Sequence, residues 1–130
     1  MNRIRAPYFS YGTLYGTATD LNPQGVSLGR LDLSGYGIFF VVKDRNDPNG
    51  RIIFQKSLGT GIAYDPIDNG TNGLFRVGWS SQDVKWPPKE YFYTCFISPT
   101  GSSYVEGTTQ IKSIGSGIFE ITRGVKVGTL

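Results

Sequence analysis

The sequence predicts an all-β fold: a single antiparallel β-sandwich of about seven to nine short strands. Three observations favour this class. The 130 residues include 18 glycines and 7 prolines, yet aromatic residues make up 14% of the chain. Short runs of aromatic and β-branched residues alternate with glycine-rich turns about every 8–15 residues, as in sandwiches. Apolar residues nowhere recur at helical spacing over a helix-length window.

The elements follow in order from these runs and turns. We expect an extended N-terminal arm over residues 1–11. A single domain then spans residues 12–130 and begins with a weak strand over 12–20. The arm is rich in aromatic residues that are costly to leave in water, so it should lie on its own domain or on a partner. Later strands are predicted at 26–33, 37–43, 51–57, 62–65, 74–81, 90–98, 103–112 and 118–127. Turns such as 44–50, 99–103 and 113–117 separate them.

The strand at 90–98, EYFYTCFIS, is apolar on both faces. Side chains alternate across a strand, so Tyr91, Tyr93 and Cys95 share one face, and Phe92 and Phe96 share the other. A sandwich has one core and can bury only one of these faces. The other face is expected to contact the N-terminal arm or a neighbouring subunit.

Charge and composition exclude several classes of function. The net charge is only +3 and the basic residues are scattered, so no nucleic-acid-binding stripe is expected. No apolar run approaches the roughly 20 residues of a membrane helix, and no signal peptide is visible. The chain has no histidine, and most of its acids fall in predicted turns, so we expect no enzyme. The single cysteine, Cys95, is interpreted as a small buried hydrophobe.

Two polar loops and two tryptophans allow other readings. Residues 44–50 and 65–73 carry oxygen ligands of the kind that calcium binds, but neither fits the EF-hand pattern, and we interpret both as hairpin tips. Trp79 and Trp86 are candidates for a sugar-stacking platform, with core or interface packing as the alternative. A nucleic-acid binder using aromatic and arginine side chains is a weaker possibility. No cofactor or metal is predicted.

A longer pattern suggests a family. The segments DLSGYGIFFVVKD, GIAYDPIDNGTNGLFRVGWSSQDV, PPKEYFYTCFIS, PTGSSYVEG and GIFEITRGV occur in this order. They resemble the N-terminal module of the baseplate upper protein family of tailed bacteriophages, a small module that recurs in tail, baseplate and fibre proteins. The resemblance covers residues 12–127. Its matching positions are Leu33, Ser34 and Gly35, Lys43 and Asp44, Asp65 and Pro66, Gly73, Asp83, Tyr91 and Tyr93, and Gly117.

The resemblance implies an immunoglobulin-like sandwich with Tyr91, Tyr93 and Cys95 in the core. It also implies a non-enzymatic virion structural protein, an adaptor or accessory subunit assembled in the host cytoplasm and docked in the tail or baseplate. Capsid decoration or head-fibre anchoring is the alternative, and binding of a host glycan the second. Expected partners are other virion proteins or copies of this chain, with no nucleic acid, no membrane and no small-molecule ligand. The expected interface residues are Arg3, Arg5, Tyr8, Phe9, Tyr11, Phe39, Trp86, Phe92 and Phe96.

Overall fold

The computed structural model describes residues 2–21, 24, 26–34, 36–64, 71–99 and 112–123, and this part of the chain is all-β without a helix. The described strands are β1 (Asn2–Pro7), β2 (Gly12–Thr17), β3 (Thr19–Leu21), β4 (Ser27–Arg30), β5 (Tyr36–Lys43), β6 (Ile52–Leu58), β7 (Gly61–Tyr64), β8 (Leu74–Trp79), β9 (Lys89–Pro99) and β10 (Lys112–Thr122). The described residues therefore contain no helix capable of spanning a membrane. The all-β prediction is confirmed.

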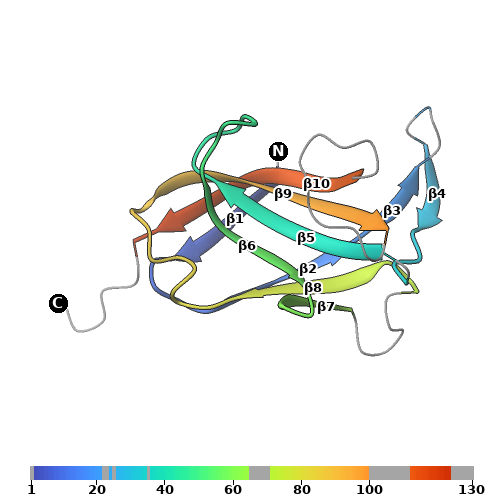
Figure 1. Ribbon diagram of the computed structural model, residues 1–130, viewed down its shortest axis with the longest axis horizontal. Coiled ribbons are helices and arrows are strands. Elements are labelled where there is room, and N and C mark those ends of the chain that lie inside the picture. Colours follow the sequence, from blue (N-terminus) through green and yellow to red (C-terminus); the bar gives the residue numbers. More distant parts are fainter. Residues whose placement is uncertain are drawn as a thin grey trace.

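Eight of these strands form one mixed sheet in the order β1-β10-β9-β5-β6-β7-β8-β2, and β3 pairs with β4 separately. All pairs are antiparallel except β1 with β10 and β6 with β7, which are parallel. The sheet curls until it is nearly closed into a barrel, so that the edge strands β1 and β2 approach each other (Figure 1). The immunoglobulin-like sandwich is not confirmed, because the hydrogen-bonded order is continuous from one edge to the other.

The core lies inside the curl, and strand alternation fills it. Ile38, Phe40 and Val42 of β5 belong to the core cluster, as the sequence pattern predicts. In β9 the buried apolar residues are Tyr91, Tyr93, Cys95 and Ile97, which confirms the predicted inward face. In β8 they are Phe75, Val77 and Trp79, again as predicted. Period-two alternation therefore identified the inward apolar side chains of β5, β8 and β9.

The first and last described strands differ from their predicted outlines. Residues 2–7 of the expected arm form β1, which pairs with β10 and places Ala6 in the core. The predicted turn at 113–117 is wrong, since these residues belong to β10. A register shift between Ser113 and Gly115 absorbs the extra residue as an irregularity in the strand. The strand predicted at 103–112 lies outside the described residues except for its last residue.

Strand β2 contains two glycines because aromatic rings of β8 lie over them. Gly12 pairs with Trp79 and Gly16 pairs with Phe75. A Cβ atom added at either glycine would collide with the ring of its partner. Both rings belong to the core cluster. The glycines of GTLYGT are therefore needed for packing rather than for a turn.

We predict that Gly16→Ala lowers the free energy of unfolding by about 1–3 kcal/mol, because the methyl group forces the buried Phe75 ring to move. The matched control is Gly115→Ala, where an added Cβ would meet no atom within 4 Å. The free energy of unfolding of this control should stay within about 0.5 kcal/mol of that of the parent chain. Urea denaturation measures both variants. Equal stability of Gly16→Ala and the parent chain would contradict this placement of the ring.

Candidate functional site

The nine residues expected at an interface fall in three places. Phe39, Phe92 and Phe96 lie on the outer face of the sheet, where Phe39 is paired with Phe96 across β5 and β9. Arg3 and Arg5 lie on β1. The remaining four, Tyr8, Phe9, Tyr11 and Trp86, lie in segments at the end of the barrel where β1 and β10 finish and β2 and β9 begin. The structure therefore divides the predicted interface residues among three separate parts of the fold.

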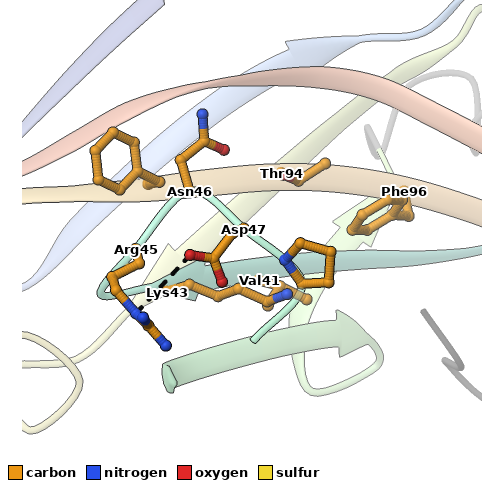
Figure 2. A pocket seen from close by; sticks show the side chains of 9 residues that line it. Val41, Lys43, Arg45, Asn46, Asp47, Thr94 and Phe96 are labelled. Atoms are coloured by element: carbon orange, nitrogen blue, oxygen red, sulfur yellow. Dashed lines mark ion pairs between the residues drawn. The ribbon is translucent and has the colours of Figure 1, made fainter. Parts of the chain in front are cut away.

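The outer face of β9 is covered in part by the chain itself. Phe92, Thr94 and Phe96 line an outer pocket of about 220 Å³, together with Val41 of β5 and the tip of the β5–β6 hairpin (Figure 2). Val41 is only 2% exposed although it stands apart from the core cluster. The second apolar face of β9 thus shares a pocket with the hairpin tip, residues 45–48. The sequence predicted the N-terminal arm or a neighbouring subunit at this face, and contact with a neighbouring subunit stays a prediction.

The carboxylates of this hairpin tip hold its own backbone. The Asp47 carboxylate accepts the Asn49 N–H at 2.8 Å, and the Asp47 carbonyl accepts the Gly50 N–H at 3.0 Å. The Asp44 carboxylate accepts the Arg51 N–H at 2.8 Å. Such bonds are typical of hairpin turns. Nowhere in the described residues do three or more His, Cys, Asp or Glu side chains gather as metal ligands. Most of the second loop, 65–73, lies outside the described residues.

Large aromatic side chains stand exposed in the turn between β1 and β2. Tyr8, Phe9 and Tyr11 are 41%, 48% and 79% exposed. The backbone of the turn is nevertheless held in place, because the Tyr8 N–H donates to the Thr122 carbonyl at 2.8 Å and the Phe9 N–H to the Val84 carbonyl at 3.3 Å. Phe9 has a φ of 57°, a left-handed conformation that is uncommon for a bulky residue.

Three cationic side chains lie over aromatic rings around this end of the barrel. The pairs, with the distance from the cationic centre to the ring centroid, are Lys85 over Phe9 at 5.8 Å, Arg51 over Trp86 at 4.8 Å and Lys89 over Tyr91 at 5.0 Å. Among the described residues none of these cations forms an ion pair. The aromatic end, defined as residues 8–11 with Arg51, Lys85, Trp86 and Lys89, therefore combines apolar rings with three cations that, in the part of the chain the structure describes, lie against rings instead of in ion pairs.

A recess of about 200 Å³ opens beside Trp86 in the aromatic end. Tyr91 forms part of its wall and donates its hydroxyl hydrogen to the Pro87 carbonyl at 2.8 Å. Burial raises the pKa of Tyr91, and the nearby Asp44 carboxylate raises it further, so the hydroxyl remains a donor. This bond fixes the 80–88 loop where it enters β9.

The other end of that loop is held by Asp83. Its carboxylate accepts hydrogen bonds from the Ser80 N–H at 2.8 Å and the Ser80 hydroxyl at 3.2 Å, and it pairs with the Lys56 ammonium of β6 at 2.8 Å. Burial alone would raise the pKa of Asp83, but the bonds from Lys56 and Ser80 outweigh it and hold the pKa below its ordinary value. Lys56 and Asp83 are remote in sequence, so no local pattern indicates this pair.

The arginines of β1 are neutralised within the chain. Arg3 donates to Glu90 at 2.8 Å and to Glu120 at 3.0 Å, and Arg5 lies 3.5 Å from Glu120. The hydrogen bonds to Glu90 and Glu120 raise the pKa of Arg3 above its usual value. These ion pairs attach β1 to the outside of β9 and β10, and the chain's own glutamates balance the arginine charges.

Two further candidates from the sequence lie in the core. Burial raises the pKa of Cys95 to about 12, so its thiol is uncharged and a poor nucleophile at neutral pH. Trp79 is 6% exposed and packs inside the barrel, whereas Trp86 is half-buried in the aromatic end. The two tryptophans therefore do not form a common exposed platform.

We predict that Asp83→Ala lowers the free energy of unfolding by about 2 kcal/mol, because three hydrogen bonds are lost and Lys56 is left without its partner. The folded-state pKa of Asp83 lies below its ordinary value of 3.8, so the contribution is complete above that value and is lost as the pH falls below it. Urea denaturation at about pH 7 and about pH 3 measures the difference between parent and variant.

That difference should shrink at the lower pH, and a difference independent of pH would contradict the role of the carboxylate. The control is Gln82→Ala, an exposed change in the same loop that should cost less than about 0.5 kcal/mol.

A scan against models of known protein families finds no match to this chain, and a search of curated proteins finds no similar sequence. The resemblance to the baseplate upper protein module therefore stays a prediction from the motif order.

Proposed function

We propose that the chain is a non-enzymatic docking subunit that binds a neighbouring protein through the aromatic end of its barrel. The observation that carries this proposal is the exposure of Tyr8, Phe9 and Tyr11 on a hydrogen-bonded turn. Apolar side chains of this size, clustered on a surface, are typical of protein interfaces, where Tyr, Trp, Phe and Arg are enriched.

The fixed backbone of the turn favours tight docking. Ordering loops and side chains on association costs conformational entropy and weakens binding. A loop that is already ordered adds less to this cost. The turn is tied to β10 through Thr122 and to the 80–88 loop through Val84. That loop is itself anchored by Asp83 and Tyr91. The backbone that carries the rings is thus held in place before any partner arrives.

The positive charge beside the rings specifies the chemistry of the partner. Arg51, Lys85 and Lys89 lie against rings with no ion pair among the described residues. A partner surface that carries acidic residues around an apolar centre would complement this pattern and associate faster at low salt. We therefore infer an apolar protein contact with an acidic rim.

The virion setting of this proposal rests on the motif order that resembles the baseplate upper protein module. It makes the chain an adaptor or accessory subunit of a phage tail or baseplate, with capsid decoration as the alternative. The immunoglobulin-like sandwich belongs to the same proposal. It would require the sheet to divide into two layers at the β6–β7 pairing, which joins only Ser57 with Gly61 and Leu58 with Ile62.

Binding of a host glycan is the remaining alternative, and it is favoured by one observation. The recess beside Trp86 offers a ring together with the polar groups of Asp44 and Lys89. Arg51 already lies over the Trp86 ring, however, at 4.8 Å from its centroid. A sugar stacking on that face must displace the guanidinium, so the glycan alternative predicts a change in Trp86 fluorescence when a glycan is added to the isolated chain with no partner protein present.

We predict that Tyr11→Ser lowers incorporation of the chain into virus particles by about tenfold, equivalent to about 1.4 kcal/mol of docking free energy. The matched control is Tyr15→Ser, since Tyr15 is similarly exposed at 74% but lies on β2 away from the aromatic end. Quantitative mass spectrometry of purified particles, normalised to the major capsid protein, measures both. Absence of the parent chain from particles, or equal incorporation of both variants, would reject the proposed function.

A further inference from the structure

Strand β1 is joined to the sheet on one side only. It pairs in parallel with β10, from Asn2 opposite Gly117 to Pro7 opposite Thr122. Within the described residues its other edge forms no strand pairing and faces the free edge of β2. Parallel pairing is slightly less stable per residue than antiparallel pairing, and a central strand has two neighbours where β1 has one. β1 is therefore held less firmly than the central strands.

The space between β1 and β2 is incompletely filled. A cavity of about 260 Å³ lies there, lined by Arg3 and Ile4 of β1, Leu14 and Tyr15 of β2, and Phe75 of β8 behind them. The two strands are linked by the four residues of the 8–11 turn, so they are close at that end. The cavity lies toward the opposite end, where the strands separate. β1 thus has a void on the side where a closed barrel would have a neighbour.

The turn that follows β1 is short and strained. Phe9 adopts a φ of 57°, and its N–H reaches the Val84 carbonyl only at 3.3 Å. For a bulky residue this left-handed conformation is unfavourable, and an extended chain would release it. Short connections under strain favour exchange of the adjoining element between identical copies.

The binding site for β1 would be the same in every copy of the chain. Ile4 and Ala6 pack on the core cluster, while Arg3 reaches Glu90 and Glu120 on the outer face. These apolar and ionic contacts fix both the position and the register of the strand. A β1 strand arriving from another molecule would make the same contacts.

We propose that two copies of the chain exchange β1, so that β1 of each copy pairs with β10 of the other and residues 8–11 extend between them. This inference goes beyond the proposed docking function: the folded-back turn presents Tyr8, Phe9 and Tyr11 to a neighbouring protein, whereas the exchanged dimer opens the turn. The two extended turns would lie side by side at the two-fold crossing.

The exchange is tested by disulfide trapping between two distinguishable copies. An affinity-tagged chain carries Arg5→Cys and an untagged chain carries Glu120→Cys, both with Cys95→Ala to remove the native thiol. These positions are partners in the β1–β10 register, and the ion pair of Arg3 with Glu90 remains. Equal amounts of the two chains are unfolded and refolded together, oxidised, and separated on a non-reducing gel.

The expected result is about tenfold more tagged–untagged disulfide than with a control pair of Arg5→Cys and Arg76→Cys, because a disulfide needs Cα atoms within about 7 Å. Arg76 is exposed on β8 and is not a partner of β1. The proposal is overturned if the mixed pair gives no more disulfide than the control while a chain with both cysteines closes its disulfide within itself. In that case normal particle incorporation of the parent chain would leave the docking function standing.

Two variants of Phe9 test the role of the strained turn in the same trapping experiment. Phe9→Gly tolerates the positive φ and should lower the trapped fraction by about threefold or more. Phe9→Leu keeps the strain while removing the ring, and its trapped fraction should equal that of the parent turn. Equal trapping in Phe9→Gly and the parent would overturn the proposal that this turn drives the exchange.

Discussion

The contact of Phe119 with rings from three other strands is the interaction on which the rest of the structure depends. Phe119 is fully buried on β10. Its ring centroid lies 6.2 Å from Phe40 of β5, 5.4 Å from Phe54 of β6 and 5.2 Å from Trp79 of β8, in edge-to-face arrangements that aromatic pairs prefer. Because β10 and β8 are each next to an edge strand of one sheet, the last contact requires that sheet to curl. The barrel shape follows from filling a single aromatic core.

The curl also assembles the aromatic end from distant parts of the sequence. When β10 and β8 come together, the turn after β1 lies between the end of β10 and the loop that leaves β8. There Tyr8 reaches Thr122 and Phe9 reaches Val84. Lys85 of the same loop then lies over the Phe9 ring. A surface that brings rings and positive charge together on a hydrogen-bonded backbone is therefore a consequence of closing the sheet.

Most of the strands and their inward side chains could be predicted from the sequence, since alternation is local. The pattern in β5, β8 and β9 separates core residues such as Phe40 and Tyr93 from outward ones such as Phe92. The same signal was present in β1, where Ile4 and Ala6 alternate with Arg3 and Arg5, but the proline and aromatic residues that follow favoured an arm. Alternation cannot decide between two packed sheets and one curled sheet, because that choice depends on pairings such as β5 with β9 and β1 with β10, which are remote in sequence.

That some aromatic side chains stay outside the core could be predicted for a related reason, whereas what covers them could not. A core already filled by Phe40, Phe54, Trp79 and Phe119 has no place for every ring of the chain. For the outer face of β9 the chain supplies a partial cover, the hairpin tip over Phe92 and Phe96. For Tyr11 the described residues supply none, and 79% of its surface stays exposed. Burial of such large exposed rings against a matching apolar surface is favourable, because apolar area is removed from water. This is why the covering surface is expected to come from another molecule.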